Sequence, residues 1–141
     1  MRVVSPHPRE LTLADEALAF TSHVPAGFSL APHMVKLNWY VRDSVDDYLG
    51  RGWTMLDQRP PTIIIHVLAN RLRSEREIAL LKTLWHEYRH AWQVLTWPGL
   101  LEERTKDEIE SDAEDFAWRA VAAWEEHQAR WQRLLLRGAA R

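Results

Sequence analysis

The chain has 141 residues, no cysteine and a formal net charge of −2. Its length and its hydrophobic content of 46% predict a single globular domain over residues 1–141. The lack of cysteine excludes disulfides, cysteine-ligated zinc sites and thiol nucleophiles. Because no stretch concentrates Lys and Arg, neither nucleic acid nor an anionic membrane is expected as a partner.

The N-terminal half predicts one helix and two strands. Residues 1–10 contain two prolines and predict an irregular lead-in, with no signal peptide, so the expected compartment is the cytoplasm. A helix is expected from Thr12 until shortly before Pro25. Alternating apolar residues predict a strand over residues 34–41, and residues 53–56 favour a second. The intervening residues 43–49 are expected to form a helical turn.

The C-terminal half predicts one strong strand and two long helices. Residues 62–68 (TIIIHVL) follow two prolines and precede a polar stretch, which favours an edge strand. Ser74 and Glu77 have the spacing of a capping box and predict the start of a helix that ends at residues 98–99. A second helix is expected over residues 105–137, with acids early and arginines late.

This element order predicts an α+β fold. We expect a small, mostly antiparallel three-stranded sheet packed on the N-terminal helix and the two longer helices.

The first of the two long helices carries His-Glu-x-x-His as His86, Glu87 and His90. Residues four apart lie on one face of a helix, so both imidazoles can reach one metal ion. Glu87 is rotated by about 100° from His86, where it can take a proton from a metal-bound water without ligating the metal. The opposite face carries an apolar seam that predicts burial, formed by Leu81, Trp85, Tyr88, Trp92 and Leu95.

A zinc site needs a third protein ligand, and the last helix offers one. Glu110 lies at the edge of that helix's apolar arc, between Ala117 and Val121 on the helical wheel. A carboxylate facing the core is costly unless it is paired or metal-bound, which favours Glu110 as the third ligand. One turn further on, Glu114 is placed to accept the ring N–H of a ligand histidine.

Together these residues resemble those of a known enzyme family. His-Glu-x-x-His followed about twenty residues later by Glu-x-x-Ala-x-x-Phe-Ala resembles the gluzincin metallopeptidases, and most of all the minimal single-domain minigluzincins and the ImmA/IrrE-type peptidases. The resemblance covers roughly residues 62–117. The metzincin pattern is excluded, because Gln93 and Thr96 stand where that family has glycine and histidine.

The resemblance implies one zinc ion held by His86, His90 and Glu110, with Glu87 as the base in peptide-bond hydrolysis. The substrate would be a peptide or protein, held by an edge strand formed by Thr62, Ile63, Ile64, Ile65 and His66.

Three questions stay open at the level of sequence. The alternative to an endopeptidase is a zinc-binding, catalytically latent regulatory or protein-interaction domain of the same fold. Residues 124–141 either continue the packed helix or cover the cleft, since terminal segments hold some minimal gluzincins latent. The oligomeric state is not predicted.

Overall fold

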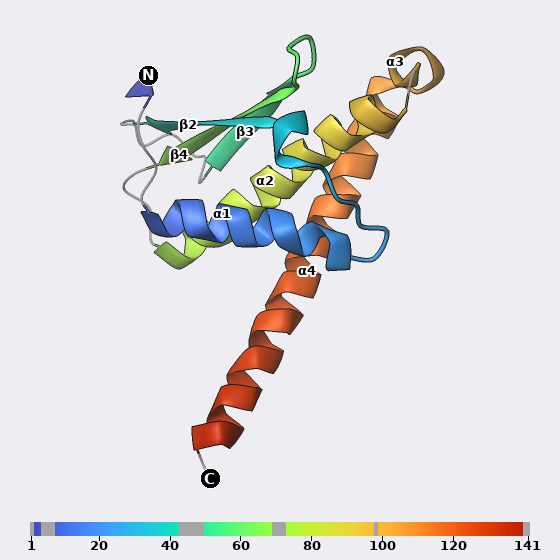
Figure 1. Cartoon of the computed structure of the whole chain (residues 1–141). Helices are drawn as coiled ribbons and strands as arrows, with labels where there is room; N and C mark the ends of the chain where they lie inside the picture. The colour runs from blue at the N-terminus through green and yellow to red at the C-terminus, as the bar shows by residue number, and fades with distance from the viewer. Residues whose placement is uncertain (1, 4–7, 43–49, 69–72, 98, 140–141) are drawn as a thin grey trace.

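The computed structural model describes residues 2–3, 8–42, 50–68, 73–97 and 99–139 (Figure 1). The fold is α+β, as predicted from the sequence. The elements in chain order are β1 (Arg2–Val3), α1 (Pro8–Phe20), two short 3-10 turns (Thr21–His23 and Pro32–Met34), β2 (Lys36–Arg42), β3 (Gly50–Met55), β4 (Thr62–Leu68), α2 (Arg73–Thr96), α3 (Leu100–Glu103) and α4 (Lys106–Ala139).

Some predicted boundaries shift in the structure. Strand β1 lies within the stretch that was expected to be irregular, and α1 begins at Pro8 rather than Thr12. Proline is well tolerated at the first helical position, where no N–H is needed. The helical turn expected at residues 43–49 lies outside the described residues. No helix among the described residues is long and apolar enough to cross a membrane.

The sheet has strand order β1-β2-β4-β3. Strand β4 pairs in parallel with β2 and antiparallel with β3, while the two-residue β1 extends the sheet antiparallel to β2. The predicted three strands are therefore present, but the central pair is parallel, so the sheet is mixed. Two parallel strands need a crossover connection between them. Here the chain leaves β2, forms β3 at the edge of the sheet, and then returns to form β4 between β2 and β3.

The prediction that β4 is an edge strand is wrong. Both of its backbone edges are occupied, by β2 on one side and β3 on the other, so Thr62 to His66 cannot add an extended substrate as a new strand. The near-continuous apolar run is typical of a strand covered on both faces, and Thr62, Ile63, Ile64 and Ile65 are all buried. The two prolines precede the strand without interrupting it. Among the described strands, β3 is the edge beside α2.

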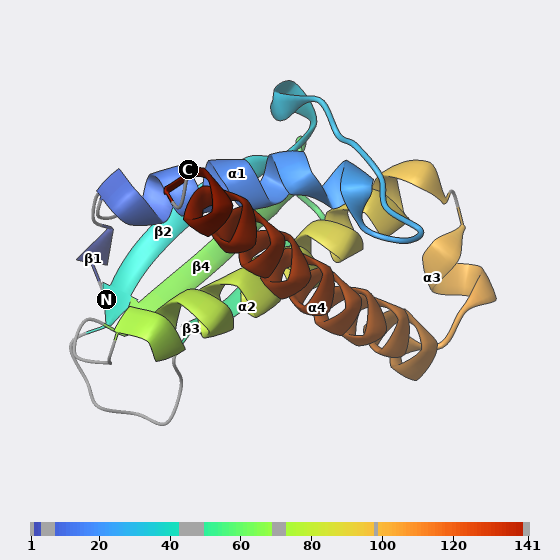
Figure 2. The same ribbon diagram turned by 90° about the horizontal axis from the view of Figure 1, so that it is seen from below.

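Helices α1 and α2 cover one face of the sheet, and α4 crosses beyond them (Figures 1 and 2). The core between these layers contains Ile63 and Ile65 of β4 and Trp85 of α2, all fully buried. The Trp85 indole donates hydrogen bonds to Ala17 O and to Thr21 Oγ1, both at 3.1 Å, which ties α1 to α2. The predicted seam on α2 is buried at Leu81, Trp85 and Tyr88, whereas its last member, Leu95, is exposed.

Helix α4 begins with a capping box. Thr105 Oγ1 accepts the Glu108 backbone N–H at 3.2 Å, and Glu108 Oε1 accepts the Thr105 N–H at 3.2 Å. The helix then runs unbroken to Ala139. Its last turns extend away from the sheet and from α2 (Figure 1), and none of residues 124–139 lines the groove formed by β3, α2 and the start of α4.

Candidate metal centre

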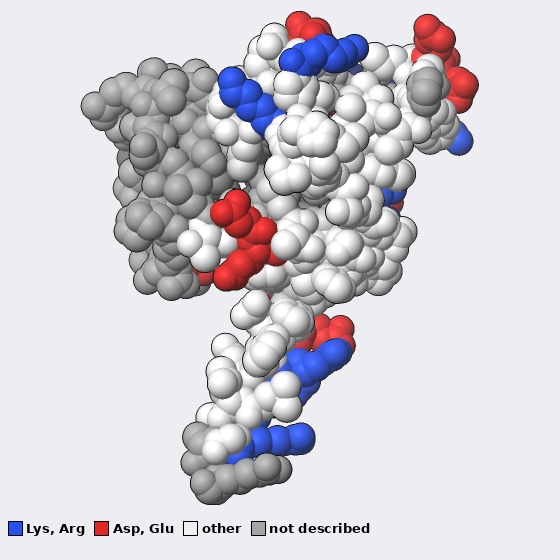
Figure 3. Space-filling model, in the orientation of Figure 1, with Lys and Arg blue, Asp and Glu red and all other residues white. Residues whose placement is uncertain are grey.

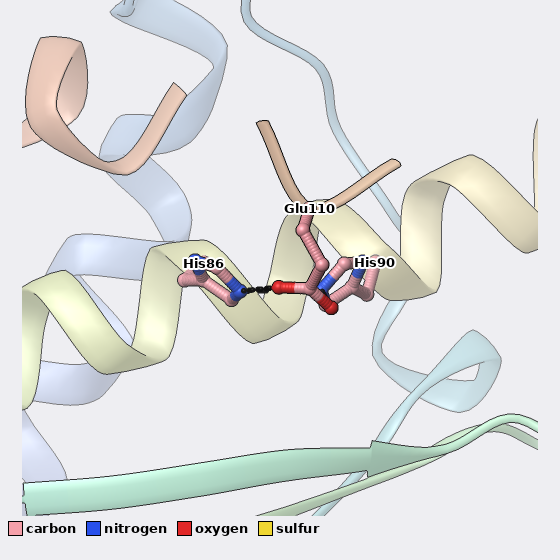
Figure 4. Close-up of side chains that lie close together, drawn as sticks. All are labelled: His86, His90 and Glu110. Atoms are coloured by element: carbon pink, nitrogen blue, oxygen red, sulfur yellow. Dashed lines mark hydrogen bonds and ion pairs between the residues drawn. The ribbon is translucent and has the colours of Figure 1, made fainter. Parts of the chain in front are cut away.

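Helices α2 and α4 bring His86, His90 and Glu110 together into a group that could hold a metal ion (Figure 4). His86 Nε2 lies 3.2 Å from His90 Nε2. The two oxygens of Glu110 divide between them, with Oε2 at 3.1 Å from His86 Nε2 and Oε1 at 3.1 Å from His90 Nε2. The two histidines are one helical turn apart on α2, which is why both rings reach the same point.

The other ring nitrogen of His86 is held by Glu114. His86 Nδ1 lies 2.9 Å from Glu114 Oε2, and Lys82 Nζ lies 2.7 Å from the second oxygen of the same carboxylate. The lysine hydrogen bond lowers the pKa of Glu114, and it outweighs the partial burial that would raise it. Glu114 is therefore an acceptor, and Nδ1 of His86 is the nitrogen that carries a proton.

The other ring nitrogen of His90 is held by Gln93. His90 Nδ1 lies 2.8 Å from Gln93 Oε1. The amide orientation is fixed because Gln93 Nε2 donates to Ile109 O at 3.1 Å and to Asp112 Oδ2 at 2.7 Å, and neither oxygen can donate in return. Nδ1 of His90 must then be the donor in its own hydrogen bond.

These outward hydrogen bonds decide what the centre can accommodate. Because Nδ1 carries the proton in each ring, the neutral form of each imidazole directs its Nε2 lone pair inward. The carboxylate of Glu110 adds further lone pairs at the same point. Three electron-pair donors in hydrogen-bonding contact repel one another unless a positive charge lies among them. The donor set therefore fits a cation.

Glu87 lies beside this centre and does not join it. Its carboxylate is buried, and its Oε2 accepts a hydrogen bond of 2.6 Å from Thr54 Oγ1 on β3. Burial raises the pKa of the Glu87 carboxyl, although the Thr54 hydrogen bond and the two nearby imidazoles oppose the rise. A carboxylate with raised pKa is a stronger base than an exposed one.

The centre opens into a groove of about 870 Å³. One wall is β3, with Gly52, Trp53 and Thr54, and the opposite wall includes Leu101 and Ile109. Arg104 and Lys106 also line it. Among the described residues, no strand pairs with the second edge of β3, and residues 52–54 of β3 line the groove, in the role that the sequence suggested for β4.

Glu110 lies beside the two histidines, as predicted, but in different surroundings from those predicted. Its side chain is 50% exposed, because it faces the open groove rather than the core. Lys82, Thr54 and Gln93 also contact the side chains of the centre and are not predicted by the sequence analysis above. Lys82 lies four residues before His86 and Gln93 three residues after His90, spacings that could have indicated both. Nothing local indicated Thr54, because it approaches from another element.

The chain matches no protein-family model, no curated protein and no solved structure. The resemblance to gluzincins therefore depends on the motif residues and on the geometry of the centre.

Proposed function

We propose that this chain is a zinc-dependent endopeptidase of the gluzincin type, with His86, His90 and Glu110 as the zinc ligands. The convergence of two imidazole nitrogens and a carboxylate on one point is the observation that carries the proposal. Two imidazole nitrogens bound tetrahedrally at about 2.0–2.1 Å from zinc stand about 3.3 Å apart. The two Nε2 atoms lie 3.2 Å apart, so the pair needs little movement to bind.

A zinc ion held by these three residues would lower the pKa of a bound water and polarise a substrate carbonyl. Glu87 accepts the proton of the attacking water and passes it to the leaving amide nitrogen. Thr54 holds one oxygen of Glu87, which leaves the other available for that proton. Glu114 and Gln93 keep the ligand rings in the orientation and tautomer that binding requires.

The edge of β3 that no described strand covers supports a peptide substrate. An extended peptide can add to a free strand edge through backbone hydrogen bonds, which confer affinity with little sequence selectivity. The edge runs beside Glu87 because Thr54 belongs to β3 and contacts Glu87 directly. A peptide paired with β3 would therefore pass the proposed base.

Two measurements test this proposal. Mass spectrometry of the metal content should find about one zinc ion per chain, consistent with a three-ligand site. Glu87→Gln should retain zinc and lose hydrolysis of a peptide library by about 10²–10⁴-fold, since the amide cannot accept the proton. Asp15→Asn, on the exposed surface of α1, should behave like the wild type.

Other results would assign the chain differently. Zinc binding without chelator-sensitive hydrolysis of any peptide would favour the latent regulatory or protein-interaction domain. Unchanged hydrolysis in Glu87→Gln would contradict the role of Glu87. A protein that binds no zinc would overturn the proposal as a whole.

A further inference from the structure

Helices α2 and α4 meet at the metal centre through two rows of residues, each spaced four apart and so lying on one face of its helix. The two rows are Lys82, His86 and His90 on α2, and Glu110, Glu114 and Trp118 on α4. Glu110 contacts both histidines, and Glu114 contacts His86 and Lys82. Trp118, the last of its row, contacts Lys82 and Glu114. The contacts of the centre therefore continue to a tryptophan that is not one of the proposed ligands.

Trp118 lies outside the hydrophobic core. Its side chain is 53% exposed, whereas Phe116 and Ala117, its neighbours in the sequence, are fully buried. Its indole N–H and its ring nevertheless both have partners within the chain. The N–H donates to Glu114 Oε1 at 3.1 Å, and Lys82 Nζ lies 4.5 Å from the centre of the ring. Since an ammonium group is attracted to the face of a tryptophan, both contacts are electrostatic, and burial does not account for the residue.

Two donors from different helices meet at one oxygen of Glu114. Lys82 Nζ lies 2.7 Å from Oε1, the same oxygen that accepts the Trp118 N–H. The other oxygen, Oε2, lies 2.9 Å from His86 Nδ1. A glutamate side chain has much rotational freedom, which two charge-assisted contacts at Oε1 restrict. They favour the orientation in which Oε2 faces the imidazole.

We propose that Trp118 is a positioning residue of the metal centre, which acts through Glu114 on the His86 ring. This inference rests on the proposed zinc site. Trp118 donates to Glu114 Oε1 and attracts Lys82 to the same place, so the carboxylate stays turned toward Nδ1 of His86. A ligand histidine whose outer N–H is held in this way keeps its tautomer and ring orientation, which strengthens metal binding.

Trp118 is a cleaner position for a test than Lys82, because its side chain is neutral. Replacing Lys82 would also remove a positive charge beside the centre, and that alone would favour a bound cation. Trp118→Leu removes the N–H donor and the ring without changing the charge. Trp131→Leu is the matched control. Trp131 is also 53% exposed, but it belongs to the last turns of α4, which project from the body of the molecule (Figures 1 and 3).

The zinc affinity of the 141-residue chain, measured by competition with a chelator, tests the proposal. Trp118→Leu should raise the dissociation constant by about 3–10-fold, the effect of losing one hydrogen bond. Trp131→Leu should leave it within about twofold. Glu114→Ala removes the direct partner of His86 and should raise it by about 10–100-fold. If Trp118 acts through Glu114, adding Trp118→Leu to Glu114→Ala should change the constant by no more than about twofold further.

Nuclear magnetic resonance of the zinc-loaded chain follows the imidazole N–H protons directly. Trp118→Leu should speed the exchange of the His86 Nδ1 proton with water by about 3–10-fold, because its acceptor is held less firmly. The Nδ1 proton of His90, which is held by Gln93, should exchange at the wild-type rate. A general loosening of the helices would instead speed both protons, so the comparison separates positioning from structural support.

Three results would each overturn this inference while leaving the zinc site in place. They are equal zinc affinities of Trp118→Leu and Trp131→Leu, the same effect of Trp118→Leu with and without Glu114, and equal changes at the two imidazole protons. A wild-type chain that binds no zinc would overturn the proposed function, and this inference with it.

Discussion

Gln93 connects the two helices that carry the metal centre. It is buried, accepts a hydrogen bond from His90 on its own helix, and donates two to α4, at Ile109 and Asp112. Ile109 and Asp112 lie on either side of Glu110 in the sequence. The Gln93 amide therefore positions two proposed ligands: the His90 ring on α2, and the turn of α4 that carries Glu110. Since all three hydrogen bonds depend on that amide, no single hydrophobic replacement can keep them.

Asp112 is itself held by Arg89. Arg89 donates to both Asp112 oxygens, at 2.8 and 3.1 Å, and its guanidinium lies 4.1 Å from the centre of the Trp92 ring. Burial would raise the pKa of Asp112, but the hydrogen bonds from Arg89 and Gln93 and the charge of Arg89 outweigh it and lower the pKa. Asp112 is therefore a carboxylate that keeps the Gln93 amide in one orientation.

Gln93→Met is expected to weaken zinc binding by about 10–100-fold, the usual cost of losing a hydrogen bond that orients a ligand. Competition against a fluorescent zinc chelator measures the affinity. Gln93→Glu separates the two roles, because it keeps an acceptor for His90 but places a carboxylate against Asp112 and the Ile109 carbonyl. That variant should unfold at lower temperature than Gln93→Met.

Gln132→Met, on the exposed surface of α4, is the control for the glutamine-to-methionine change and should alter neither quantity. Wild-type zinc affinity in Gln93→Met would show that the amide is structural only, and would leave the proposed zinc site itself untouched.

At the scale of elements, the close approach of β3 to α2 brings Thr54 to Glu87. Gly52 allows this approach. A Cβ at position 52 would lie 2.8 Å from Thr83 Cγ2 and 2.9 Å from the backbone oxygen of Ile64. The first atom belongs to a side chain that can move, but the second belongs to the central strand and cannot yield without disturbing the sheet.

Gly52→Ala should therefore destabilise the fold by about 1–3 kcal/mol, the usual cost of overpacking, and should reduce peptide hydrolysis by shifting Thr54 away from Glu87. Urea unfolding and the hydrolysis rate measure the two effects. Gly138→Ala is a matched control, because a Cβ there meets nothing within 4 Å. In a helix that change should be neutral or stabilising by up to about 1 kcal/mol. Equal stability of the two variants would contradict the argument.

The same elements show what the sequence could and could not predict. Helical periodicity sets the faces of α2 and α4 on which His86, His90 and Glu110 lie. This periodicity can be recognised within a short stretch of sequence. The order of strands depends on pairing between distant segments. The two prolines before β4 favour an edge, but its apolar run fits the central position that it has in the sheet. Thr54 was missed for the same reason, since its contact with Glu87 depends on how β3 lies against α2.

At the scale of the whole molecule, the proposed zinc ion would link α2 to α4, because two ligands come from one helix and the third from the other. A ligand that binds only the folded state stabilises it by RT ln(1 + [L]/Kd), or about 2.7 kcal/mol at a free concentration of 100 times Kd. For a domain of this size, each kcal/mol raises the melting temperature by about 3 °C. Zinc at a free concentration of 100 times Kd should then raise the melting temperature by about 8 °C.

Scanning calorimetry of the metal-free chain, with zinc added at known free concentrations, measures this shift. Glu110→Gln should reduce the shift to less than half, because the neutral amide is a poor zinc ligand and the link to α4 is weakened. The metal-free variant should be at least as stable as the metal-free wild type, since it removes the carboxylate that faces two imidazole lone pairs. A full zinc shift in Glu110→Gln would mean that α4 supplies no ligand through this residue, and that the ion is held by α2 alone.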